Sequence, residues 1–107
     1  MRETLLRAKT RLDRLDLYPR PVRIARVRVV VAPRLFRLPW YRLFDGYATY
    51  FVIFVRRPDV GEDLITHELC HVWQMQHHPL RMPLSYLRQG YEGNRYEAEA
   101  RAAAAPP

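Results

Sequence analysis

Apolar residues recur with a helical period at two places in the chain. Within residues 3–17, leucines are spaced among arginines and aspartates as in an amphipathic helix, which Tyr18 and Pro19 end. We expect this helix to cover one face of a sheet. Residues 64–78 carry a second helical pattern, in which the apolar side chains gather on one face. That face would pack against a core and leave the opposite face free.

Three stretches between the two helical patterns have the composition of strands. In residues 22–31, apolar and charged side chains alternate at first and three valines follow. This pattern favours a β-strand, which Pro33 ends. Residues 35–44 alternate again, but Pro39 reduces this stretch to an edge strand or a loop. Residues 47–55 form the strongest predicted strand and follow a turn dipeptide at residues 45–46, so we expect a hairpin there. This strand is apolar on both faces, so helices must cover at least one of them.

The C-terminal third predicts a short helical segment and a final helix. Residues 84–88 form a helical turn or two, with prolines before them and glycines after them. Asn94 is a favourable N-cap for a helix that runs through the alanines and ends at Pro106. Small side chains let two helix backbones approach closely, so we expect this helix to pack on the helix of residues 64–78.

These elements predict one α+β domain over residues 1–107, with an N-terminal helix, a small three-stranded and mostly antiparallel sheet, and further helices. A chain of 107 residues leaves no room for a second domain, and 49% hydrophobic residues suffice for a modest core. Its longest apolar run has nine residues, whereas a helix that spans a bilayer needs about 20. Arginines interrupt every apolar stretch near the N-terminus, so no secretory signal is expected. We expect a soluble, cytoplasmic protein without a membrane span.

The formal net charge of +7 is typical of proteins that bind nucleic acid. However, Lys9 is the one lysine among 18 basic residues, and the arginines are scattered rather than gathered in a stripe. A nucleic-acid partner is therefore the less favoured interpretation. The single cysteine, Cys70, excludes an internal disulfide. Its position three residues after His67 allows a thiolate ligand, but a buried free thiol is favoured.

The pentad His67-Glu68-Leu69-Cys70-His71 has the H-E-x-x-H spacing. On a helix, two histidines four residues apart lie about 40° apart around the axis and one turn apart along it, so both imidazoles can reach one metal ion. Glu68 is turned by about 100° from His67 and stands beside such an ion rather than on it. This arrangement is typical of two zinc ligands with a carboxylate that accepts a proton from water.

A catalytic zinc site has three protein ligands and one open position, so a third ligand is expected after His71. The candidates are His77, His78, Glu92, Glu97 and Glu99. His78 shares a face with His71 but lies about 10 Å further along a straight helix, too far to bind the same ion. Glu97 lies early in the final helix and can approach from across a cleft. Glu99 points about 160° away from Glu97, so only one of them can face the metal.

Two stretches of the chain resemble the gluzincin type of zinc metallopeptidase, in which H-E-x-x-H on one helix is completed by a glutamate on the next. They are ITHELCHVWQ at residues 65–74 and NRYEAEAR at residues 94–101. The length is similar to that of the minigluzincins, single-domain members that look like the upper half of a thermolysin-like catalytic domain. This resemblance implies a zincin-like fold, with a sheet whose edge strand rims the cleft, an active-site helix and a glutamate helix.

The resemblance implies that His67, His71 and Glu97 bind Zn²⁺ and that Glu68 is the general base of peptide-bond hydrolysis. It thereby favours Glu97 over Glu99 as the third ligand.

One position departs from the pattern of that family. Many gluzincins place an aspartate four residues after the ligand glutamate, where it orients a zinc histidine, and this chain has Arg101 there. Asp63, one turn before His67, is the candidate left for this role, and Arg101 is expected to pair with Glu97 instead. A donor to the oxyanion is also required. The candidates near in sequence, for each of which core packing is the favoured interpretation, are Tyr86, Tyr91, Arg95 and Tyr96.

Three functions are compatible with these features. The first is zinc-dependent hydrolysis of a peptide or protein substrate that lies along the edge strand, with Glu68 as the base. The second is a peptidase-like domain that binds zinc but is inactive or self-inhibited. A domain of this size is too small to include the lower half of a thermolysin-like catalytic domain. The third is a basic nucleic-acid-binding module with two incidental histidines on a surface helix. The motif favours the first, without indicating a particular substrate or an oligomeric state.

Overall fold

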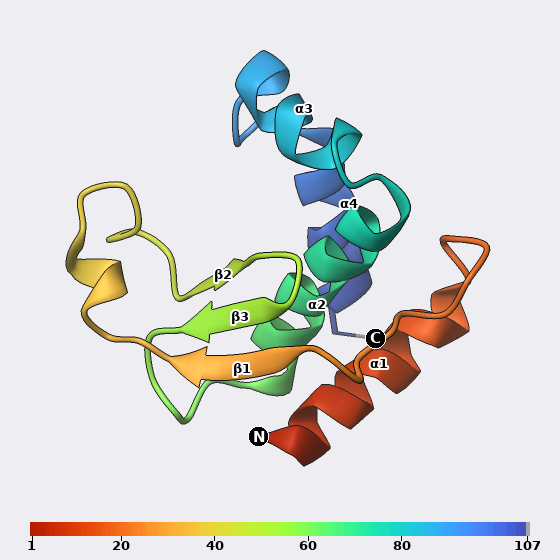
Figure 1. Ribbon diagram of the computed structural model, residues 1–107, viewed down its shortest axis with the longest axis horizontal. Coiled ribbons are helices and arrows are strands. Elements are labelled where there is room, and N and C mark those ends of the chain that lie inside the picture. Colours follow the sequence, from red (N-terminus) through yellow and green to blue (C-terminus); the bar gives the residue numbers. More distant parts are fainter. Residues whose placement is uncertain (107) are drawn as a thin grey trace.

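The computed structural model describes residues 1–106, in which a group of helices packs beside a small sheet (Figure 1). In chain order the elements are α1 (Arg2–Leu15), β1 (Arg28–Val31), the 3₁₀ helix η1 (Leu35–Arg37), β2 (Gly46–Ala48), β3 (Val52–Val55), α2 (Glu62–His77), α3 (Arg81–Gln89) and α4 (Arg95–Ala104). The predicted α+β class is confirmed. No helix in this part of the chain combines the length and the apolar character needed to cross a membrane.

Helix α2 is central, because α1, α4 and the sheet all pack against it (Figure 1). It begins after Gly61, and its first turn contains Glu62 and Asp63, where carboxylates favour the positive end of the helix dipole. The same two carboxylates form ion pairs with Arg7 and Arg11 of α1. Helix α1 therefore packs mainly on α2, whereas we expected it to lie over the sheet.

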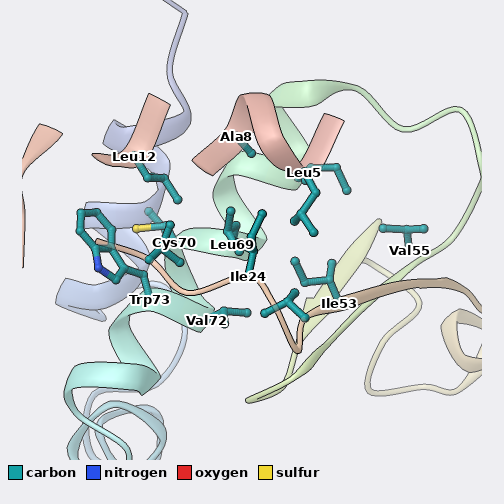
Figure 2. Close-up of a cluster of buried hydrophobic side chains, with 14 residues drawn as sticks. Leu5, Ala8, Leu12, Ile24, Ile53, Val55, Leu69, Cys70, Val72 and Trp73 are labelled. Atoms are coloured by element: carbon teal, nitrogen blue, oxygen red, sulfur yellow. The ribbon is translucent and has the colours of Figure 1, made fainter. Parts of the chain in front are cut away.

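The main core is a cluster of buried side chains from α1, α2, α4, the sheet and the segment before β1. Figure 2 labels ten of its members, which are Leu5, Ala8, Leu12, Ile24, Ile53, Val55, Leu69, Cys70, Val72 and Trp73. The apolar face predicted for α2 is confirmed, since Leu69 and Val72 are 0% exposed and Trp73 is 1% exposed. Full burial of each such side chain contributes about 1.5–3 kcal/mol, so this face orients the helix and turns its other face toward β2.

The sheet is mixed, with strand order β1-β3-β2. Strand β2 pairs with β3 in the antiparallel sense, but β1 pairs with β3 in parallel, so the predicted mostly antiparallel sheet is wrong for β1. The connection from β1 to β3 passes through η1 and β2, which is long enough for two strands to run in the same direction. Residues 35–44 form η1 and a loop, which is the second alternative that Pro39 allowed.

Of the stretch predicted as a strand at residues 22–31, only the last four residues, Arg28–Val31, form one. Before it, the Val22 N–H donates to the Asp13 carboxylate at 3.0 Å. The backbone N–H and C=O of Arg23 pair with the side-chain amide of Gln76 at 3.0 and 2.7 Å. Side chains of α1 and α2 thus satisfy backbone groups that a neighbouring strand would otherwise have bound.

The turn of the hairpin lies inside residues 47–55, between Ala48 and Val52, and not at the predicted dipeptide of residues 45–46. Strands β2 and β3 are joined by a turn that Thr49 closes. The Thr49 N–H donates to the Val52 carbonyl at 2.8 Å, and the Thr49 hydroxyl accepts from the Val52 N–H at 3.0 Å. This turn contains no Gly, Pro, Asn or Asp, so its sequence has the composition of a continuous strand.

The predicted cap of the last helix is confirmed. The Asn94 side-chain oxygen accepts from the N–H groups of Tyr96 and Glu97 at 2.8 and 3.2 Å, and its amide donates to Ser85 of α3 at 2.8 Å. An N-cap of this kind is worth about 1 kcal/mol. It also fixes Glu97 in the first turn of α4. Ala100 is fully buried in the core, in line with the expected close approach of α4 to α2.

Candidate metal centre

Three of the predicted site residues converge between α2 and α4. Nε2 of His67 lies 2.8 Å from Oε1 of Glu97, and Nε2 of His71 lies 2.9 Å from Oε2 of the same carboxylate. The two imidazole Nε2 atoms are 3.2 Å apart. All the donor atoms of this group lie within 4.8 Å of one another, so the group can hold a metal ion.

The donor set fits a small divalent cation. Ligand atoms that are each about 2.0–2.1 Å from a tetrahedral zinc lie roughly 3.3 Å apart, so the observed spacing requires shifts of a few tenths of an ångström. The side chains of His71 and Glu97 are 9% and 2% exposed, and that of His67 is 18% exposed. Two nitrogens and one carboxylate leave a fourth position open on the more accessible side.

Glu97 and His71 each favour the charged form of the other. Burial favours the neutral form of Glu97, but hydrogen bonds from His67 and His71 outweigh it and lower the pKa of Glu97 below its ordinary value. Burial likewise disfavours a charged His71, yet its hydrogen bond with Glu97 raises the pKa of His71 above its ordinary value. The Glu97 carboxylate therefore favours positive charge at the position between it and His71.

A buried amide orients His71. Its Nδ1 atom lies 2.8 Å from Oε1 of Gln74, and Nε2 of Gln74 donates to the carboxylate of Glu99 at 3.1 Å and to the carbonyl of Tyr96 at 2.9 Å. Partners of this kind fix the tautomer of a ligand histidine. No role was predicted for Gln74, although its place one turn after His71 is a signal that could have identified it.

The other residues considered as metal ligands, or as the group that orients a ligand, lie outside the converging group. Asp63, the expected orienting carboxylate, pairs with Arg11 at 2.7 Å and forms no hydrogen bond or ion pair with either histidine of the group. Glu99 faces away from the converging group and accepts from the Tyr18 hydroxyl at 2.5 Å. Cys70 is 0% exposed within the main core, which confirms the buried free thiol. Among residues 1–106, the converging group contains none of the other candidates, which are Cys70, His77, His78, Glu92 and Glu99.

Glu68 lies next to the converging group and faces β2. It is 6% exposed, and a Cβ atom added to Gly46 would lie 3.0 Å from its Cγ and 3.1 Å from its Oε2. Burial raises the pKa of Glu68, and the positive charge of His71 and His67 offsets part of the rise. Gly46 thus gives the carboxylate the space it occupies.

Two of the proposed oxyanion donors reach the group, but they bind Glu97. The hydroxyl of Tyr86 donates to Oε2 at 3.1 Å and that of Tyr91 to Oε1 at 3.0 Å. Arg101 approaches Oε1 only to 3.9 Å and has a half-exposed side chain, so its expected pairing with Glu97 is loose. The remaining candidates, Arg95 and Tyr96, contact each other instead, with the guanidinium over the ring.

The group opens into a cleft of about 850 Å³. Its floor is α2, and its walls are the loop of residues 40–45, β2, α3 with the segment after it, and α4. Most of the lining is aromatic or aliphatic, and its largest apolar and aromatic side chains are Trp40, Tyr41, Phe44, Tyr47, Met75, Met82, Tyr86 and Tyr91. A concave apolar site with a few convergent polar groups is the usual form of a ligand site.

No family model, curated protein or solved structure matches this chain. The likeness to gluzincins therefore rests on residues 65–74 and 94–101, and function must be inferred from the geometry of the site.

Proposed function

We propose that this protein is a zinc-dependent metallopeptidase that hydrolyses peptide bonds. The observation that carries the proposal is the convergence of His67, His71 and Glu97 within 4.8 Å at the floor of an open cleft. Glu68, one residue after the first of these histidines, lies beside the same cleft. Two imidazoles, one ligand carboxylate and one free carboxylate are the donor and base set of a metal-dependent hydrolase.

Zinc held by these three side chains would supply Lewis-acid activation of a water molecule and of the scissile carbonyl. Glu68 would accept a proton from the attacking water and transfer it to the departing amine. Burial suits Glu68 to this role, because a carboxyl group with a raised pKa can both accept and return a proton near neutral pH.

The free edge of β2 offers a place for an extended peptide. The carbonyl of Asp45 accepts from the N–H of Arg56 at 2.9 Å, which sets the alternation of hydrogen-bonded pairs along β2 and β3. In that alternation, the N–H and C=O groups of Gly46 and Ala48 point away from β3. Both residues line the cleft. A substrate that pairs with this edge would add a strand and bring its backbone carbonyl toward the converging group.

The test combines metal analysis with peptide cleavage. The purified chain should bind one equivalent of zinc and cleave peptides from a mixed fluorogenic library, and chelation should abolish cleavage until zinc is restored. Glu68→Gln should retain the zinc and lose cleavage, whereas His67→Ala should lose the zinc. Full zinc retention by His67→Ala, or an unchanged rate in Glu68→Gln, would refute the assignment. Stoichiometric zinc with no cleavage would instead support a peptidase-like domain that is inactive or self-inhibited.

A further inference from the structure

Two segments at the mouth of the cleft expose large apolar side chains. In the loop after η1, Leu38, Trp40 and Leu43 are 42%, 76% and 88% exposed. Around α3, Leu80, Leu84 and Leu87 are 72%, 50% and 83% exposed. We refer to residues 34–44 and 80–88 together as the cleft rim.

The leucines of α3 form a stripe that faces away from the domain. Leu80, Leu84 and Leu87 have the i, i+4, i+7 spacing and lie within about 60° of one another around the helix. Met82 and Ser85, on the other side of the same helix, are buried at 5% and 7% exposure. The helix therefore packs through one side and presents a second apolar side to its surroundings.

The cleft rim is also basic. It contains no Asp or Glu, and its five arginines are all exposed: Arg34, Arg37, Arg42, Arg81 and Arg88. Within residues 1–106, none of these five forms an ion pair with a carboxylate. By contrast, Arg7 and Arg11 of α1 are paired with the acidic first turn of α2. The positive charge of the rim is thus free to act on a partner.

The two parts of the rim border the same cleft. Trp40 and Leu43 line it on one side, and Met82 of α3 lines it on the other. The ring of Phe44, at the end of the first part, packs on that of Tyr91, which lies three residues after the second part, at a centroid distance of 5.1 Å. Helix α1 lies away from both of them (Figure 1).

We propose that the cleft rim docks on a lipid bilayer that carries anionic headgroups. An exposed tryptophan and leucines beside arginines are the features of surfaces that enter the headgroup region of such bilayers. Nucleic acid would neutralise the arginines but would leave the leucine stripe in water. A second copy of the chain would cover the leucines but would bring two sets of unpaired arginines together. Charge and apolar surface are both accommodated by the bilayer, and zinc is not required.

The experiment is partitioning of the full chain onto phosphatidylcholine vesicles, with and without phosphatidylglycerol. The chain has two tryptophans, of which Trp40 is 76% exposed and Trp73 is 1% exposed. Anionic vesicles should therefore shift the emission of Trp40 to the blue, and brominated lipid should quench it, while Trp73 stays constant. Neutral vesicles should bind at least tenfold more weakly. Equal binding to both vesicle types, or no binding to either, overturns the proposal.

Paired substitutions assign the surface. Trp40→Ser with Leu43→Ser, and Leu84→Ser with Leu87→Ser, should each weaken binding roughly tenfold or more, because burial of two large side chains is worth more than the 1.4 kcal/mol of one factor of ten. The matched control, Leu6→Ser with Leu15→Ser, removes leucines of α1 that are 47% and 45% exposed and should leave binding unchanged.

Two double substitutions of arginine, equal in net charge, test whether the arginines of the cleft rim bind the bilayer. Two further measurements test nucleic acid and a second copy of the chain as partners. Arg81→Gln with Arg88→Gln should weaken binding to anionic vesicles roughly thirtyfold, at about 1 kcal/mol for each arginine near the surface. Arg14→Gln with Arg26→Gln, which has the same net charge, should have a much smaller effect. Displacement of the protein from vesicles by duplex DNA, or dimerisation that the leucine substitutions abolish, contradicts the bilayer assignment. Each readout is independent of zinc and of peptide cleavage, so this proposal and the peptidase proposal can fail separately.

Discussion

The Nδ1–H group of His71 donates to Oε1 of Gln74 across 2.8 Å in the interior of the domain. The orientation of that amide is determined, because its nitrogen donates to Glu99 and to the carbonyl of Tyr96, so its oxygen is left as the acceptor. Gln74 is 0% exposed, so these contacts are shielded from bulk solvent. The neutral form of His71 therefore carries its proton on Nδ1 and leaves the lone pair of Nε2, the atom that faces Glu97, available to a metal ion.

Replacing this amide should weaken metal binding. Gln74→Leu removes the partner of the His71 Nδ1–H, and loss of such a partner costs roughly 10- to 100-fold in metal affinity. Competition with a chromophoric chelator measures the effect. Gln76→Leu, in the same helix but bound to the backbone of Arg23, is the matched control and should keep the parental affinity. Equal zinc affinities for the two variants would show that Gln74 does not position the ligand.

The two glutamates of α4 should behave differently. Glu97→Ala removes the carboxylate that lies 2.8 and 2.9 Å from the two histidines, so stoichiometric zinc binding should be lost. Glu99→Ala should reduce affinity by less than tenfold, because Glu99 contacts the site only through Gln74. Calorimetric zinc titration of both variants checks this order. The opposite order would make Glu99 the ligand.

A single methyl group at Gly46 should test the position of the base. Gly46→Ala places a Cβ 3.0–3.1 Å from the side chain of Glu68, which must then move. Overpacking of this kind costs about 1–3 kcal/mol of stability, and a displacement near 1 Å can lower a rate by roughly 100-fold. We expect cleavage to fall while zinc content is kept. Gly93→Ala, where the nearest atom lies at an ordinary 3.6 Å, is the control.

The stability of the metal-free chain should decrease as the pH rises through neutrality. The folded state raises the pKa of His71 above 6.5, so its stabilising charge is fully present below about pH 6.5 and is lost as the pH rises through the folded pKa. The pKa of Glu68 is also raised in the folded state. Its ionisation therefore lowers the stability of the folded state as well, beginning as the pH rises above the ordinary pKa of a glutamate. Thermal unfolding in chelator between about pH 6 and 8.5 measures the slope.

Added zinc should stabilise the folded chain more at high pH than at low pH, opposite to the trend of the metal-free chain. A metal ion competes with protons for the histidines, so the stabilisation by added zinc should grow across the same pH interval. A chelated protein that becomes more stable with rising pH, or a zinc effect that shrinks, would contradict this account of the site. His71→Gln should flatten both curves.

Arg11 should contribute more to stability than its neighbour Arg7. Its guanidinium binds Glu62 and Asp63 at 3.1 and 2.7 Å and donates to the Ala104 carbonyl at 3.3 Å, which links α1 to both helices of the metal centre. Arg11→Met should lower the free energy of unfolding by about 1 kcal/mol. Arg7→Met, with a more exposed ion pair, should change it less. Urea denaturation at low and high salt compares the two.

Several features of the fold could be predicted because they depend on neighbours in the sequence. The helical spacing of His67 and His71, the apolar face of α2 and the cap at Asn94 each involve residues within about one turn. The turn at Thr49 was missed although it is local, because a threonine hydroxyl closes it without the usual turn residues. The parallel pairing of β1 with β3 was missed because it joins distant segments.

The sequence by itself determined that two imidazoles and a carboxylate share one stretch of helix, and which face of that helix is apolar. Only the tertiary structure decided which glutamate of α4 meets them, that Gln74 rather than Asp63 orients His71, and that the rim of the cleft carries unpaired arginines beside exposed leucines. The physical reason is that helix periodicity fixes relations between residues a few positions apart. Contacts between α2, α3 and α4 depend instead on how buried faces pack, which no local pattern encodes.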